Sequence, residues 1–173
     1  MPYTFLKRGM DVALSLMLLG VLWPVMLALC VAIAAESTGS PLFAQTRIGR
    51  HGRPFNLLKF RSMIKDAASQ GPYWTQANDP RITCVGRFIR NTSLDELPQL
   101  WNVLVGDMSL VGPRPDLPAQ EAAYSPENWR LRHRVRPGIT GLAQVNGGGA
   151  ITSEARLVCD MAHPESSTLT MDV

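Results

Sequence analysis

The chain has 173 residues, which is enough for one domain or for one domain with an appendage. Hydrophobic residues make up 46% and charged residues 18% of the sequence, and a net charge of +3 excludes a disordered polyelectrolyte and a bulk nucleic-acid coat. Its three cysteines are scattered without a CxxC pair, which excludes a disulfide framework and a cysteine zinc site.

The N-terminal region contains an apolar run from Val12 to Ala35, which is twenty-four residues without a charge. A run longer than ~18 residues is typical of a membrane segment. One interpretation is a secretory signal peptide with Lys7 and Arg8 as its basic region, but the apolar part of such a peptide is typically only ~7–15 residues long. A second interpretation is a spanning helix, because the run would be roughly 36 Å long.

A re-entrant helix, which enters and leaves the membrane by the same face, is the third interpretation and the one that we favour. Basic residues flank the run on both sides, so the distribution of positive charge does not place its ends on opposite faces. Pro24 lies in the middle of the run, where it removes a backbone donor and clashes with the preceding turn. Each half of the run would reach only roughly 18 Å. We therefore expect a re-entrant membrane helix broken at Pro24.

The rest of the chain is typical of a small α+β domain that is mostly helical. Two short apolar runs separated by glycines predict a β-hairpin over Leu42–Ile48 and Pro54–Phe60. Apolar spacing and turn residues predict, in chain order, a short helix around 62–68, a loop over 71–80, helices over 82–90 and 93–105, an extended or turned segment over 112–115, helices over 117–124 and 127–134, and a loop over 137–149.

The segment Ser93-Leu94-Asp95-Glu96 is the central candidate for chemistry, and it has two interpretations. As structure, Ser93 followed three positions later by Glu96 is the pattern of a helix capping box. As function, two adjacent carboxylates at a helix start can serve a phosphate substrate: one acid attacks phosphorus while its neighbour holds magnesium. The spacing alone favours the structural interpretation.

The basic residues are fourteen arginines and only three lysines, a bias that suits bidentate contacts to anionic ligands. Four arginines lie around the acid pair in the sequence: Arg81, Arg87, Arg90 and Arg114. Four more alternate with other residues and form either a solvated basic helix end or a patch for phosphate or anionic lipid: Arg130, Arg132, Arg134 and Arg136.

Several sequence blocks follow one another over most of the chain. The first is Lys7-Arg8 before the apolar run with Pro24, and the others are Gln45–Gly49, Phe55, Lys59–Met63, Asp79–Thr83, Gly86–Arg90, Thr92–Leu100, Asn102–Leu104, Gly106–Pro115, Arg136–Gly141 and Ala143–Asn146. Taken together, these blocks resemble the bacterial sugar transferases, the monotopic phosphoglycosyl transferases.

The resemblance implies an enzyme that transfers a phosphosugar from a UDP-sugar to polyprenyl phosphate and releases UMP, the membrane-committed first step of glycoconjugate and polysaccharide assembly. It implies that Asp95 is the nucleophile of a covalent phosphosugar intermediate and that Glu96 binds Mg²⁺. It also implies that Arg90, Arg114 and Arg136 lie near substrate phosphates.

The resemblance also implies a place and partners. The protein is then monotopic, on the cytoplasmic face of the bacterial inner membrane, with the bilayer but no nucleic acid as a partner and a homo-oligomer as an open option. The domains expected are a re-entrant membrane helix in 1–36, a cytosolic catalytic domain in 37–161 and a short tail in 162–173.

The sequence departs from the family pattern in two places. Trp23 stands before Pro24 where the family often has Ser or Asp, so the kink depends more on the proline. The family usually continues past this C-terminus, so we expect the short tail in 162–173 to be truncated, divergent or both. A different class of function also stays open: a catalytically silent, membrane-anchored module that binds nucleotide-sugars or acts as a scaffold. The sequence does not identify the sugar.

Overall fold

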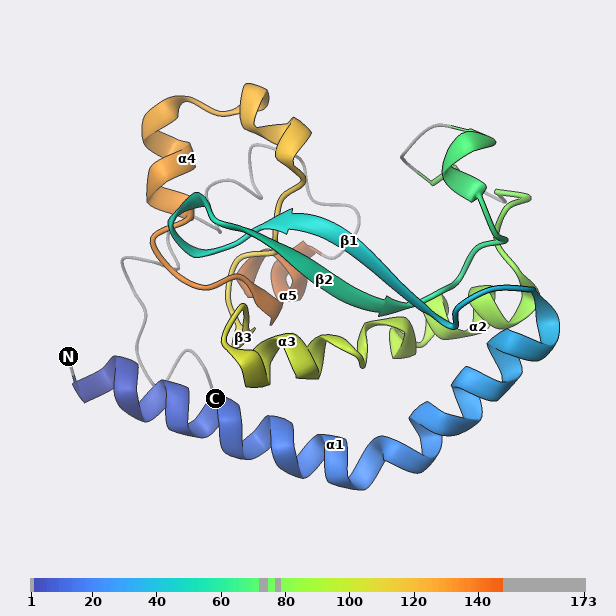
Figure 1. Ribbon diagram of the computed structural model, residues 1–173. Coiled ribbons are helices and arrows are strands. Elements are labelled where there is room, and N and C mark those ends of the chain that lie inside the picture. The colour runs from blue at the N-terminus through green and yellow to red at the C-terminus, as the bar shows by residue number, and fades with distance from the viewer. Residues whose placement is uncertain (1, 72–74, 77–78, 148–173) are drawn as a thin grey trace. The chain divides into compact units, whose positions relative to one another are not determined.

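The computed structural model describes residues 2–71, 75–76 and 79–147, so the predicted tail in 162–173 lies outside the described part (Figure 1). The chain forms two compact units that alternate along the sequence. The first unit comprises the described residues of Met1–Leu18, Gln45–Leu57 and Gln99–Val173, and the second comprises those of Leu19–Ala44 and Leu58–Pro98. Helices and a few short strands build both units, as the predicted α+β class requires.

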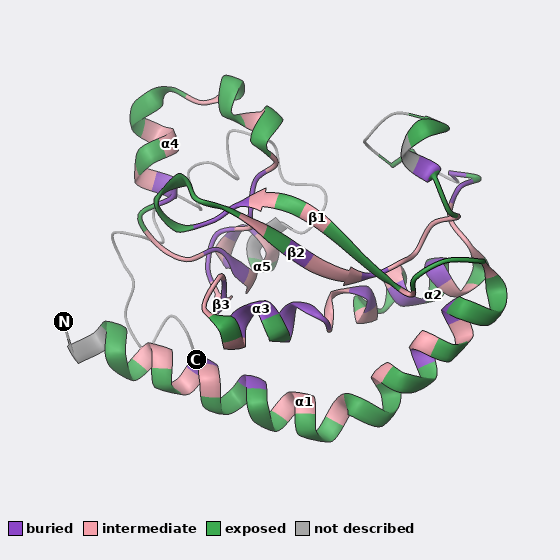
Figure 2. Cartoon of the chain, in the orientation of Figure 1, coloured by how far each residue is buried: buried purple, intermediate pink, exposed green. Residues whose placement is uncertain are grey.

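Helix α1 (Pro2–Glu36) is one long apolar helix, and it begins well before the predicted apolar run. Its stretch Thr4–Glu36 has the length and hydropathy of a membrane helix, with a mean hydropathy of 2.6 in an 18-residue window that is only 11% buried. Most of the helix is exposed or intermediate in Figure 2. Such low burial is unlike the core helix of a soluble protein, which lies mostly inside the fold.

Pro24 lies inside α1, and the helix continues on both sides of it. The predicted break is therefore wrong as a statement about secondary structure, because the helix does not end at Pro24. A proline still lacks the N–H that would donate to the carbonyl of Gly20 four residues earlier, so it weakens the helix without terminating it. The re-entrant path through a membrane stays a prediction.

Strands β1 (Leu42–Ile48) and β2 (Pro54–Phe60) pair in a two-stranded sheet and confirm the predicted hairpin with its predicted bounds. The connecting turn closes with a hydrogen bond of 2.8 Å from the Gly49 N–H to the Arg53 carbonyl. Gly52 takes a φ of 73°, a left-handed conformation that glycine adopts without steric cost. His51 takes a φ of 59° in the same turn.

The second unit has its core where α1, β2 and α2 (Cys84–Asn91) meet, and it buries Leu29, Ile33, Phe60 and Ile89. Helix α2 lies close to the predicted range 82–90. Its first turn is capped twice, because the Thr83 hydroxyl accepts from the Gly86 N–H at 2.9 Å and the Glu36 carboxylate accepts from the Cys84 and Val85 N–H groups at 2.6 and 3.0 Å. The last residue of α1 thus satisfies donors that a helix start leaves open.

The first unit has a second core of Leu57, Val103 and Met108. Helix α3 (Gln99–Val105) leads into strand β3 (Ser109–Val111), which pairs in parallel with β4 (Gly138–Thr140). The predicted loop over 137–149 is therefore wrong, since this segment holds β4 and helix α5 (Leu142–Gly147). A Cβ on Gly138 or Gly141 would collide with the backbone of Gly112, so these glycines allow a close approach of two chain segments.

The remaining elements differ from the predictions mainly in length. The helix predicted around 62–68 is only a 3-10 turn at Ala67–Ser69, and the one predicted over 117–124 is a 3-10 helix at Pro118–Ala123. Residues 112–115 contain no helix or strand, as predicted. Helix α4 (Pro126–Arg132) confirms the helix predicted over 127–134, and Ser125 caps it by accepting from the Asn128 N–H.

Candidate active site

The acid pair lies on a short 3-10 turn, Leu94–Glu96, that follows α2. The predicted single helix over 93–105 is wrong: the turn ends before Pro98, which has no N–H, and α3 begins only at Gln99. Asp95 is buried, and its side chain is 13% exposed against 18% for Glu96. The two carboxylates are therefore mostly shielded while part of each still faces solvent.

The capping box predicted for Ser93 and Glu96 is absent. Ser93 takes a φ of 56° and ψ of 15°, a left-handed conformation, and its hydroxyl makes no capping bond. The Glu96 N–H donates to the Ser93 carbonyl at 3.2 Å instead. A serine at positive φ is an uncommon conformation with a steric cost. The capping-box interpretation of this motif is therefore wrong.

Lys59 of β2 is the partner of both acids. Its ammonium donates to Glu96 Oε1 at 2.8 Å and lies 3.8 Å from Asp95 Oδ2. One positive charge so close to two carboxylates offsets part of their mutual repulsion. Reasoning from the sequence missed Lys59 as a site residue. The available signal was composition, because it is one of three lysines in an arginine-rich chain and is the charged residue of a mostly apolar strand.

Two of the arginines near the acid pair in the sequence have defined roles in the second unit. Arg90, in the last turn of α2, is half-buried and donates to the Thr75 hydroxyl at 2.9 Å. Arg81 is buried and forms a two-pronged ion pair with Asp79, with N–O distances of 2.9 and 2.6 Å. The Arg81 guanidinium holds the pKa of Asp79 well below its usual range. Arg81 is thus engaged within the fold, whereas the phosphate role of Arg90 stays a prediction.

Arg114 and Arg136 belong to the first unit. Arg114 is half-buried between Pro113 and Pro115, and its carbonyl accepts from Arg132 at 2.8 Å. The Nε of Arg136 donates to the Gly106 carbonyl at 2.8 Å, just beyond the end of α3. Burial of Arg136, and then the positive charges of Arg8 and Arg50, lower the pKa of its guanidinium. Both predicted phosphate roles stay predictions.

The alternating arginines at positions 130, 132, 134 and 136 differ in burial, so they form neither a fully solvated helix end nor one continuous basic patch. Arg130 and Arg134 are exposed. Arg132 is buried, and its Nε donates to Asp116 Oδ2 at 2.5 Å. A buried guanidinium needs such a partner because an unpaired charge is costly to remove from water. The sequence pattern did not reveal this ion pair, since Asp116 lies sixteen residues away.

The adjacent acids Asp95 and Glu96 are candidate magnesium ligands. Among residues 2–71, 75–76 and 79–147, no group of three or more His, Cys, Asp or Glu side chains could hold a metal ion. Magnesium commonly takes only one or two carboxylates and completes its shell with water and substrate phosphate. The adjacent carboxylates of Asp95 and Glu96 fit that donor set.

Comparisons with known proteins agree on one family. The model described as "Bacterial sugar transferase" matches residues 2–173. The chain is 43% identical to the "Undecaprenyl-phosphate glucose phosphotransferase" of Komagataeibacter xylinus, over 96% of this chain and 34% of that protein. It is 48% identical to the "UDP-glucose:undecaprenyl-phosphate glucose-1-phosphate transferase" of Escherichia coli (strain K12), over 82% and 31% of the two chains. A protein of the same name from Caulobacter vibrioides is 45% identical, over 96% of this chain and 65% of that protein. The chain thus spans about a third of the length of the first two relatives.

Proposed function

The chain belongs to the bacterial sugar transferase family, and on that premise we propose that it transfers a phosphosugar from a UDP-sugar to polyprenyl phosphate and releases UMP. The relatives' names describe transfer of a sugar phosphate to undecaprenyl phosphate. The observation that carries the proposal for this chain is the acid pair on its strained turn, with Lys59 beside both carboxylates and with the capping box absent.

In the first half-reaction, a carboxylate oxygen of Asp95 attacks the phosphorus that bears the sugar. A bond forms between Asp95 and this phosphorus, the bond to the bridging oxygen breaks, and UMP leaves with that oxygen. In the second half-reaction, an oxygen of polyprenyl phosphate attacks the same phosphorus and releases Asp95. The product is polyprenyl-diphospho-sugar, and the carboxylate is regenerated.

Glu96 and Lys59 serve this chemistry through charge. We assign Mg²⁺ to Glu96, with Asp95 alongside; when bound, the ion would offset the negative charge of the phosphates. Lys59 holds the Glu96 carboxylate at 2.8 Å and adds a positive charge 3.8 Å from Asp95. Arg90, Arg114 and Arg136 are proposed as phosphate contacts, because a guanidinium can bind two phosphate oxygens at once.

We propose further that α1 is re-entrant and that the folded part of the chain lies on the cytoplasmic face. Near its start, Arg8 donates to the Val103 and Leu104 carbonyls at 2.6 and 2.8 Å, within the first unit. At its other end, Glu36 caps α2 within the second unit. A spanning α1 would put these two attachments on opposite sides of the bilayer.

Chain connectivity argues against that spanning arrangement. Strands β1 and β2 each have residues in both units, so a bilayer between the units would be crossed by a two-stranded hairpin. The open edges of such a hairpin would leave backbone groups unpaired in lipid, at a cost of several kcal/mol for each group. Basic residues on both flanks of the apolar run agree with a cytoplasmic location for both ends.

The test is UMP release from a panel of UDP-sugars with undecaprenyl phosphate as acceptor, together with the intact mass of the protein after mixing with each UDP-sugar alone. We expect UMP release with at least one sugar, and a sugar-phosphate adduct on wild type that is missing in Asp95→Asn. Glu96→Gln should slow both half-reactions and alter the Mg²⁺ dependence. UMP release retained in Asp95→Asn would contradict the covalent mechanism, and binding of UDP-sugars without any release would favour the silent binding module.

A further inference from the structure

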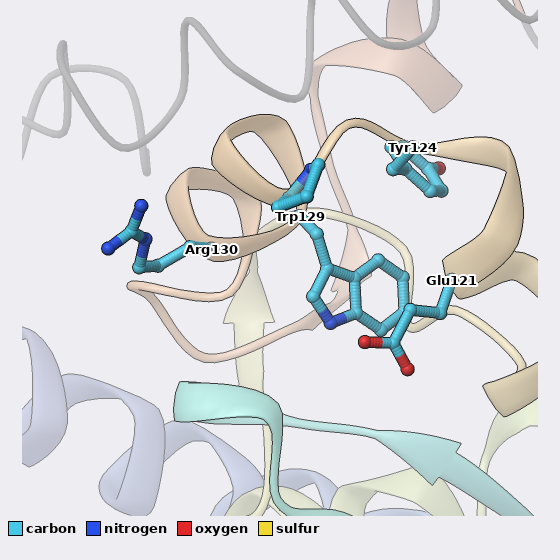
Figure 3. A pocket seen from close by; sticks show the side chains of 5 residues that line it. Glu121, Tyr124, Trp129 and Arg130 are labelled. Atoms are coloured by element: carbon cyan, nitrogen blue, oxygen red, sulfur yellow. The ribbon is translucent and has the colours of Figure 1, made fainter.

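The first unit contains a cavity of about 350 Å³ that no step of the proposed transfer uses. Its lining includes Glu121 of the 3-10 helix Pro118–Ala123 and Tyr124 just after that helix. Pro126, Trp129 and Arg130 of α4 complete the lining (Figure 3). Its size falls within the range of small-molecule sites, ~300–1,000 Å³. An aromatic wall with a few charged groups is also the usual lining of such sites.

The aromatic wall of the cavity is held by a network of ring contacts and hydrogen bonds. The rings of Tyr124 and Trp129 lie 5.4 Å apart at an angle of 51°, and the Trp129 ring lies 4.1 Å from that of His133. The Tyr124 hydroxyl donates to Asp116 at 3.3 Å, and His133 Nδ1 lies 2.7 Å from the Trp129 carbonyl. The wall therefore has a fixed orientation before any ligand arrives, which lowers the entropic cost of binding.

The polar groups of the cavity are available to a ligand. Glu121 and Arg130 are exposed and line the same cavity. Within the described part of the chain, neither of their charged groups has a hydrogen bond or an ion pair, and the indole N–H of Trp129 has no acceptor. One carboxylate and one guanidinium give the lining no net charge. A phosphate would meet the Glu121 carboxylate, so a neutral ligand rich in hydroxyl groups fits better.

We propose that this cavity binds a pyranose ring. The C–H face of the sugar packs on the Trp129 indole, its hydroxyls donate to the Glu121 carboxylate, and one of its oxygens accepts from the indole N–H. The cavity residues belong to the first unit and Asp95 to the second, and the proposal goes beyond the proposed transfer. The sugar has two sources, a nucleotide-sugar or a glycoside without a nucleotide, and both present the same ring.

The experiment uses the full chain in phospholipid nanodiscs, because detergents with sugar head groups would compete. Saturation-transfer NMR and titration would measure binding of methyl glucopyranoside, methyl galactopyranoside, UMP and UDP-glucose, in wild type and in the Asp95→Asn background. We expect the glycosides to bind in both proteins. Glu121→Gln keeps the shape but loses the charge, and should weaken glycoside binding about tenfold, as expected for losing hydrogen bonds to a charged group.

The matched control is Glu127→Gln, because Glu127 is an exposed acid in α4, the helix of Trp129, and does not line the cavity. It should bind the glycosides as wild type does. A second variant, Trp129→Phe, keeps a ring but removes the N–H and part of the stacking face, and should also weaken binding. Equal glycoside binding by wild type and Glu121→Gln, or none by wild type, would overturn the proposal. So would displacement of the glycoside by UMP, which would make the cavity a nucleotide site.

The two proposals fail separately. Glycoside binding that persists in Asp95→Asn supports the cavity whether or not UMP is released. Loss of UMP release with intact glycoside binding concerns the transfer alone.

Discussion

Lys59 Nζ lies 2.8 Å from Glu96 Oε1, and this ion pair joins β2 to the turn that carries both candidate catalytic acids. The same ammonium lies 3.8 Å from Asp95. Lys59 therefore fixes the position of one carboxylate and moderates the charge of the other. Because all three side chains are only partly exposed, solvent screens their interaction less than it would at an open surface.

Replacing Lys59 with glutamine should separate the charge of this residue from its size. We expect turnover to fall about tenfold or more, since the substrate phosphates would meet two carboxylates with less opposing charge. UMP release would be measured beside the thermal melt. Lys65→Gln is the control, because Lys65 is an exposed lysine nearby in the sequence. Turnover at the wild-type rate in Lys59→Gln would mean that the ion pair only holds the fold.

Ser93 gives a test of the turn itself. Its φ of 56° costs an L-residue about 1–2 kcal/mol but costs glycine little. Ser93→Gly should therefore melt near the wild-type temperature and keep its turnover, and Ser93→Ala should do likewise because the hydroxyl makes no cap. Ser93→Val places a β-branched side chain in this conformation, so it should lower both the melting temperature and the turnover. A marked loss in Ser93→Ala alone would instead assign the hydroxyl a direct role.

Local patterns in the sequence were enough to predict several elements. The hairpin follows from two apolar runs separated by glycines, and α2 and α4 follow from apolar spacing and turn residues. The acid pair was recognised as a candidate because adjacent carboxylates are chemically distinctive. Each of these signals lies within one short stretch of the sequence.

The features that were missed depend on contacts between distant segments. The parallel pairing of Ser109 with Gly138 joins residues far apart in the chain, and the glycines that permit it look like a loop when read alone. Glu96 has the spacing of a capping residue, but Lys59 draws its carboxylate away. A three-dimensional partner thus overrode a local preference in both cases.

The stability of the first unit should depend on pH through His133. Burial is the main cause that lowers the pKa of His133, and it outweighs the Asp116 and Glu121 carboxylates that favour the charged form. Arg132 opposes protonation as well. The unfolded chain then binds the proton more readily, so this histidine should have no effect well above pH ~6.5 and should destabilise the fold as the pH falls below that value.

The measurement is the melting temperature of wild type and His133→Gln between pH 7.5 and 5.5. The melting temperature of wild type should fall more on acidification than that of the variant, which has no titrating group at this position. His51→Gln, at an exposed residue of the hairpin turn, is the matched control and should follow wild type. An equal pH dependence in wild type and His133→Gln would contradict the expected direction.

The membrane topology has a direct test, which uses Thr4→Cys and Ser40→Cys in a chain whose native cysteines are replaced by serine. The two positions flank the apolar run. If α1 is re-entrant, an impermeant maleimide added to intact cells should label neither position, and it should label both once the inner membrane is opened. Labelling of only one of them in intact cells would show that the helix spans.

Pro24 supplies the matched variant for this topology. In Pro24→Leu the backbone N–H returns and can donate to the Gly20 carbonyl, so a straight helix is favoured locally. A straight helix alone need not span, because Arg8 is bound to carbonyls in the last turn of α3 and Glu36 to the first turn of α2. We therefore expect Pro24→Leu to expose one position to the outside only when these attachments are also removed. Exposure in Pro24→Leu alone would mean that the proline, and not the two attachments, determines the path of α1.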